Sequence, residues 1–131
     1  MACLVDTHIA LWFIAASERL PKAAHELLRS QRGPCYVSIV SAWEVMLKHQ
    51  SRPDQMIIDA GTFVRDCEES GFTLLGLKPE HVNMAATLPA MARHKDHFDR
   101  MLLAQAQAEN LSFITHDRAF EAYESPNIML V

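Results

Sequence analysis

The sequence predicts an α/β fold: a three-layer α/β/α arrangement in which helices cover both faces of a short parallel sheet of four to five strands. Short apolar runs of strand length alternate along the chain with longer segments of helical character. Those runs are mostly apolar, as expected for strands buried on both faces, and parallel sheets are built in this way. The 131 residues contain no repeat or linker, so we expect a single domain over residues 1–131.

The predicted strands are short apolar runs bounded by polar or turn-forming residues. Ala2 to Val5 forms the first such run and ends at Asp6, and Leu111 to Thr115 forms a similar run before Asp117. In order, the predicted strands are 2–5, 36–38, 72–77, 111–115 and 128–131.

Proline, glycine and asparagine mark several boundaries of the predicted helices. Pro21 suits the first position of a helix, and Gly71 and Asn110 are typical residues just beyond a helix end. Residues 50–54 are expected to form a polar turn. In order, the predicted helices are 9–15, 21–31, one through Trp43 to about His49, 62–70, 79–87, 97–109 and a short one at 118–123.

Composition is that of an ordinary globular protein, with 50% hydrophobic and 21% charged residues. The net charge of −4 and the lack of a long basic run mean that any phosphate-binding surface must be assembled from scattered residues. The available cations include Arg19, Lys22, Lys48, Arg52, Arg93, Lys95 and Arg100.

Cellular location is predicted from what the sequence lacks. No apolar stretch reaches 18 residues and no signal peptide is recognisable, so we expect no membrane association. The three cysteines are an odd number without metal-site spacing, and Cys3 and Cys35 lie in apolar runs as expected for buried thiols. These observations favour a cytoplasmic protein.

Four carboxylates at particular places point to the chemistry: Asp6, Glu44, Asp99 and Asp117. Two follow predicted strands and two lie near the starts of predicted helices, so the fold can bring them to the crevice beyond the carboxyl ends of the strands. Four acids gathered there repel each other unless cations neutralise them, and hard divalent ions prefer oxygen ligands. The sequence therefore predicts a metal-dependent phosphodiesterase.

Each of these acids also has a simpler explanation as a helix cap. Asp6, Asp96 and Asp117 each precede a predicted helix, and Ser41 with Glu44 has the spacing of a capping box. A helix beginning directly after Ser38 would instead place Glu44 deeper and on a different face. Separate caps, however, predict nothing about the residues around them.

The segments around the four acids together resemble the PIN domain, and specifically the VapC-like toxin ribonucleases of type II toxin–antitoxin modules. Residues 4–12 resemble the opening strand and first helix of that family, 37–45 its second strand and Trp-Glu helix, 94–106 its Asp-Pro-Phe-Asp-Arg block and 115–120 its closing Thr-x-Asp-x-x-Phe. The match runs in order along the chain. Two departures are His97 where proline is usual and residues 50–53 where a Gly-Lys stretch is common.

The resemblance implies a role for each matched residue. Asp6, Glu44 and Asp99 match the three core metal-binding acids, Asp117 matches a fourth, less uniformly required one, and Thr115 matches a hydroxyl that orients a carboxylate or a water. Ser38 and Arg100 lie at positions that could contact substrate. Arg100 could equally pair with Asp96, and Ser38, like Thr7, could simply cap a helix or support the site.

The function implied by the resemblance is a Mg²⁺- or Mn²⁺-dependent endoribonuclease that hydrolyses RNA with a metal-activated water. It also implies a cognate antitoxin protein that covers the crevice, and a homodimer. The main alternative is a catalytically weak PIN-fold protein that acts as an RNA- or protein-binding module. A phosphoacceptor receiver domain fits less well, because Asp6 is followed by Thr7 and His8 and no lysine follows the last strand.

Overall fold

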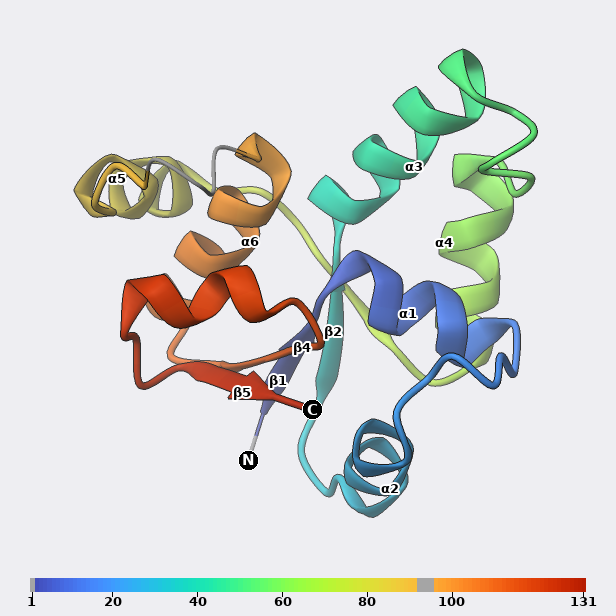
Figure 1. The fold of residues 1–131 in the computed structure, drawn as a ribbon, viewed down its shortest axis with the longest axis horizontal. Coiled ribbons are helices and arrows are strands. Elements are labelled where there is room, and N and C mark those ends of the chain that lie inside the picture. Colours follow the sequence, from blue (N-terminus) through green and yellow to red (C-terminus); the bar gives the residue numbers. More distant parts are fainter. Residues whose placement is uncertain (1, 92–95) are drawn as a thin grey trace.

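The computed structural model describes residues 2–91 and 96–131. Over these residues the strands form one five-stranded sheet in the order β3-β2-β1-β4-β5, and every neighbouring pair is parallel (Figure 1). The strands are β1 (Cys3–Val5), β2 (Cys35–Ser38), β3 (Thr73–Leu75), β4 (Ser112–Thr115) and β5 (Ile128–Leu130). The predicted parallel α/β sheet is confirmed.

Helices cover both faces of this sheet, and Figure 1 shows α1, α2 and α4 on one side with α5, α6 and η1 on the other. Side chains alternate along β1, so Cys3 and Val5 enter one core and Leu4 enters the other. The helices are α1 (Thr7–Ile14), α2 (Lys22–Ser30), α3 (Ile39–Ser51), α4 (Ala60–Glu69), α5 (Pro79–Thr87), α6 (His97–Ala108) and the 3₁₀ helix η1 (Arg118–Tyr123).

The boundaries differ from the predicted ones by a few residues, each for a local reason. Helix α1 begins at Thr7 because Asp6 caps it. Pro21 occupies the cap position of α2 instead of its first turn. Helix α3 continues through Ser51 into the predicted polar turn, and the predicted strand 72–77 is shorter at both ends.

Strand order places a switch point at β1. The chain passes from β1 outward through β2 to β3, and then returns to the other side of β1 to form β4 and β5. In open parallel sheets, ligands bind beyond the carboxyl ends of the strands at such a point. The same end of the sheet carries Asp6 after β1 and Asp117 after β4.

Among the described residues, no helix is both long enough and apolar enough to cross a bilayer.

Candidate active site

Asp6 stands at the centre of the site, directly after β1, with 5% of its surface exposed. Its Oδ1 accepts the backbone N–H of Thr7 at 2.8 Å, which caps α1, and its Oδ2 accepts the Thr115 hydroxyl at 2.6 Å. The same Thr115 oxygen accepts the backbone N–H of Asp117 at 3.0 Å. Thr115 therefore orients one acid and positions the backbone of another, joining the ends of β1 and β4.

Glu44 reaches the site from the second turn of α3, and 3% of its surface is exposed. The cap of α3 is Ser38, whose Oγ accepts the backbone N–H of Val40 at 3.0 Å. The capping-box interpretation of Ser41 and Glu44 is therefore wrong, because the cap of this helix lies three residues before Ser41.

The carboxylate of Glu44 is held by two neighbours. Thr7 Oγ1 lies 2.7 Å from Glu44 Oε1 and 2.8 Å from the Ser41 hydroxyl oxygen. An ionised carboxylate only accepts, so Thr7 donates to Glu44 while Ser41 donates to Thr7. On the other side, Lys48 Nζ lies 2.7 Å from Glu44 Oε2, one helical turn further along α3.

Asp99 and Asp117 complete the group of acids. Helix α6 is capped by Asp96, which accepts the backbone N–H of Asp99 at 3.1 Å, so the predicted cap at Asp96 is confirmed and Asp99 lies in the first turn. Asp117 caps η1 by accepting the backbone N–H of Ala119 at 2.9 Å. Asp6 and Asp117 thus cap helices and also lie in the site, so the two interpretations of these acids are compatible.

All four predicted acids line one cleft of about 370 Å³. Asp96, Lys48 and Arg19 line it too, together with three rings, those of His8, Trp12 and His116. The Trp12 ring contacts both histidines, with centroids 5.8 Å from His8 and 6.0 Å from His116. Arg19 lies over the same indole at 5.3 Å.

Negative charge in the cleft perturbs its own acids. Burial, and then the charges of four neighbouring carboxylates, raise the pKa of Asp99 to about 8; these neighbours are Asp6, Asp96, Glu44 and Asp117. Burial also raises the pKa of Asp6, against the opposing effect of its hydrogen bonds from Thr115 and Thr7. The cleft therefore favours a proton or another cation on these oxygens.

The donor set fits a hard divalent cation such as Mg²⁺ or Mn²⁺, which prefers carboxylate oxygens and water. Within residues 2–91 and 96–131, no three His, Cys, Asp or Glu side chains stand close enough to hold an ion as they are. At Glu44, the Lys48 ammonium and the Thr7 hydroxyl occupy both carboxylate oxygens.

The charge crowding predicts how stability of the metal-free protein depends on pH. Because the pKa of Asp99 rises from 3.8 to about 8 on folding, the folded state binds more protons than the unfolded state between these values. Stability should therefore fall as pH rises through that window. Asp99→Asn removes the charge and should raise the melting temperature at pH 8 in EDTA, by on the order of 5 °C, with little change at pH 4.

Thermal melts of both proteins in EDTA across this pH range check the prediction. Asp59→Asn is the matched control, because Asp59 caps α4 through the backbone N–H of Thr62 and is far from the cleft acids in sequence. A melting temperature that responds equally to both substitutions at pH 8 would contradict charge crowding at Asp99.

Two further predicted site residues have structural roles in this conformation. Ser38 is fully buried, donates its hydroxyl to Gln105 Oε1 and caps α3, so the prediction that it contacts substrate is not supported. Arg100 donates to the Pro89 carbonyl at 2.8 Å and to the Tyr123 hydroxyl at 3.0 Å, and among the described residues it forms no ion pair with Asp96. Its contact with phosphate stays a prediction.

Sequence reasoning named Arg19 and Lys48 only among scattered cations and did not place them in the cleft. The place of Lys48 could have been found, because it lies four residues after Glu44 and helical spacing puts such pairs on one face. The half-buried ring of Trp12 packs against one hydrophobic core and also lines the cleft. Arg93 and Lys95, named as possible phosphate ligands, and His94 of the matched block lie outside the described residues.

The fold and the site together indicate the class of PIN-like proteins. A parallel sheet lies between two layers of helices, and carboxylates line a cleft at its central switch point. The PIN domain family matches residues 3–125, and the chain belongs to this family. It is similar to Ribonuclease VapC22 of Mycobacterium tuberculosis (strain ATCC 25618 / H37Rv), with 25% identity over 128 residues that cover 98% of this chain and 96% of that protein. The predicted VapC-like PIN resemblance is thus confirmed.

Solved structures of toxin–antitoxin proteins share the fold. VapBC-1 from nontypeable Haemophilus influenzae matches with a TM-score of 0.70 at 16% identity, covering 99% of this chain and 98% of that chain. VapBC2 from Rickettsia felis, bound to a promoter DNA fragment, matches with a TM-score of 0.68 at 15% identity, covering 100% and 98%. A toxin–antitoxin complex from Klebsiella pneumoniae matches with a TM-score of 0.64 at 19% identity, covering 97% and 95%.

Proposed function

We propose that this protein is a metal-dependent endoribonuclease, the toxin of a type II toxin–antitoxin pair acting in the cytoplasm. One observation carries the proposal: four carboxylates from four separate parts of the chain line one cleft, where burial and then their mutual repulsion raise the pKa of Asp99 to about 8. Such an arrangement costs stability, which a purely structural role would not require. The similarity to Ribonuclease VapC22 supports RNA as the substrate class.

Asp6, Glu44 and Asp99 would hold Mg²⁺ or Mn²⁺, and Asp117 would orient a water or hold a second ion. When bound, such an ion makes a water nucleophilic near neutral pH and offsets the charge that develops on the phosphate. The chain supplies orientation: Thr115 fixes the carboxylate of Asp6, and the Ser41–Thr7 hydroxyl pair fixes that of Glu44.

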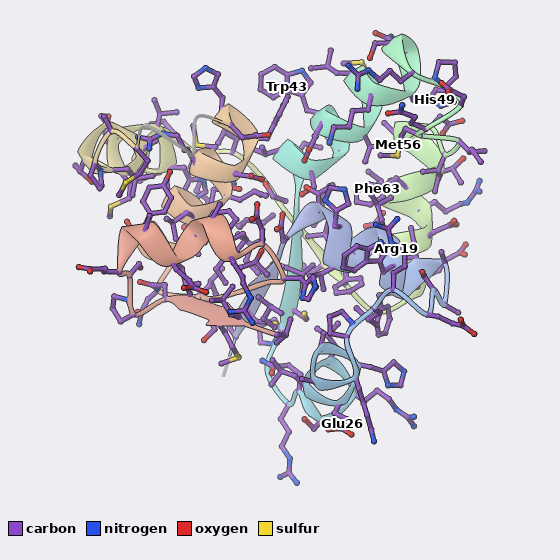
Figure 2. The ribbon with its side chains drawn as sticks, in the orientation of Figure 1. Arg19, Glu26, Trp43, His49, Met56 and Phe63 are labelled. Atoms are coloured by element: carbon purple, nitrogen blue, oxygen red, sulfur yellow. The ribbon has the colours of Figure 1, made fainter. Side chains whose placement is uncertain are left out.

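Partner proteins are part of the proposal. The structural neighbours include toxin–antitoxin complexes, which supports an antitoxin for this chain. Helix α3 also presents an exposed apolar stripe at i, i+4 and i+8, formed by Ile39, Trp43 and Leu47. Trp43, which is labelled in Figure 2, is 54% exposed, and its ring centroid lies 4.9 Å from that of Phe98. Exposed apolar faces of this kind are typical of protein interfaces, and we propose a homodimer here.

Chelation tests the catalytic part of the proposal. Purified protein should cleave single-stranded or looped RNA with Mg²⁺ or Mn²⁺, lose activity in EDTA and regain it when metal is returned. The reason is that EDTA removes the ion from the acids and added metal replaces it. Product formation on a denaturing gel measures the effect. Full cleavage in excess chelator would rule out the metal mechanism. RNA binding without cleavage under any metal would favour the alternative of a non-catalytic binding module.

A further inference from the structure

A second cleft adjoins the acidic one and has the opposite character. It measures about 460 Å³, which is within the range of pockets that hold small ligands. Two of its lining residues, His8 and Lys48, also line the acidic cleft, so the two are neighbours that share one wall. The full lining is His8, Lys48, Ser51, Arg52, Gln55 and Met56.

Hydrogen-bond donors dominate this lining, and no carboxylate takes part in it. Lys48 and Arg52 contribute positive charge, and Gln55 contributes an amide. In the described part of the chain, the Arg52 guanidinium has no hydrogen-bond or ion-pair partner, whereas Lys48 already pairs with Glu44. A protein of net charge −4 thus places an exposed arginine, without a partner among the described residues, directly beside the cleft that holds the four acids.

The cleft wall is held in place by the turn that follows α3. The backbone N–H groups of Gln55 and Met56 both donate to the Arg52 carbonyl, at 2.9 and 3.0 Å. His49 Nδ1 lies 2.8 Å from the Met56 carbonyl, and Figure 2 shows both residues at the far end of α3. Because a carbonyl only accepts, His49 carries the proton on this nitrogen. The cationic side chains therefore project from a fixed backbone.

We propose that this second cleft binds a phosphate of the RNA strand next to the phosphate that lies over the acids. The inference rests on the proposed function, because it takes the acidic cleft as the place where the RNA strand binds. It assigns that strand one direction out of the acidic cleft, past Lys48 toward Arg52. Arginine suits the site because its planar guanidinium can donate two parallel hydrogen bonds to phosphate oxygens. This phosphate contact comes from residues 50–53, where the chain departs from the Gly-Lys stretch common in the family.

Binding without catalysis tests the proposal. A fluorescent 12-nucleotide oligouridylate is titrated with protein in EDTA, from 50 to 200 mM KCl, for wild type and Arg52→Gln. One lost phosphate contact on a single strand should reduce the slope of log K against log salt by about 0.7. This corresponds to about eightfold weaker binding at 50 mM and about threefold at 200 mM.

Arg29→Gln is the matched control. Arg29 is also exposed and without a partner among the described residues, but it lies on α2, at the opposite end of the molecule from α3 in Figure 1. Its substitution should leave the slope unchanged. Equal slopes for wild type and Arg52→Gln, or no binding by wild type at 50 mM salt, would overturn the proposal. The proposal would also be overturned if Arg52→Gln kept the wild-type salt dependence for RNA but bound the antitoxin protein more weakly. That result would assign the cleft to a protein partner.

The assay separates this inference from the proposed function. It contains no metal and no cleavage step, so loss of the Arg52 effect leaves metal-dependent cleavage by wild type intact. Conversely, a wild-type protein that never cleaves RNA can still show the Arg52-dependent slope.

Discussion

Asp6→Asn should abolish most RNA cleavage while leaving the fold intact. Asparagine caps helices about as well as aspartate. Its side-chain oxygen can still accept the Thr7 N–H, and its amide group can still form a hydrogen bond with the Thr115 hydroxyl. What it lacks is the charge that would hold the ion. Weakening a group that only supports a metal ligand costs about 10–100-fold, so losing the central ligand should cost at least on the order of 100-fold at every metal concentration.

Rates against metal concentration, together with thermal melts, measure this effect. Asp59→Asn again serves as control, since it replaces a helix cap outside the cleft. The cleavage rate of Asp117→Asn should fall between those of Asp6→Asn and Asp59→Asn. This variant should need a higher metal concentration, and excess Mn²⁺ should partly restore its activity. If Asp6 and Asp117 acted only as caps, all three variants would cleave RNA at the wild-type rate.

Expression of the chain alone should stop bacterial growth. A ribonuclease that acts on cellular RNA removes templates or adaptors faster than they are replaced, and the proposed antitoxin is then absent. Growth curves and viable counts after induction measure the effect, with Asp6→Asn at the same protein level as the inactive control. Co-expression of the small protein encoded by the adjacent gene should restore growth. Normal growth at high levels of folded wild type would contradict the toxin assignment.

Much of the fold was predictable because the signals are local. Continuous apolar strands such as 111–115 indicate a sheet buried on both sides, and residues such as Gly71 mark where helices end. Boundaries were less certain because caps decide them. Asp6 starts α1 two residues earlier than the apolar pattern suggests, since the capping bond to Thr7 comes from a polar side chain.

The acids of the site were predictable from their places after strands and on helices, but their surroundings were not. Whether Ser38 faces substrate or core depends on where Gln105 lies, 67 residues further along the chain. Arg100 similarly finds its partners on the segment before α6 and on η1. Such contacts depend on how distant elements pack, and no local pattern encodes them.

The bond between Asp6 and Thr115 has a consequence for the timing of activity during synthesis. These residues are separated by 109 positions, and β1 can pair with β4 only after the chain as far as Thr115 has left the ribosome. A nascent chain that ends after α5 carries Asp6 and Glu44 but lacks Asp99, Thr115 and Asp117. Closing so long a loop is also slow relative to local folding. Under the proposed function, a ribosome that makes this chain is therefore not exposed to its activity until the segment that carries Thr115 and Asp117 has emerged, which gives an antitoxin that interval in which to be present.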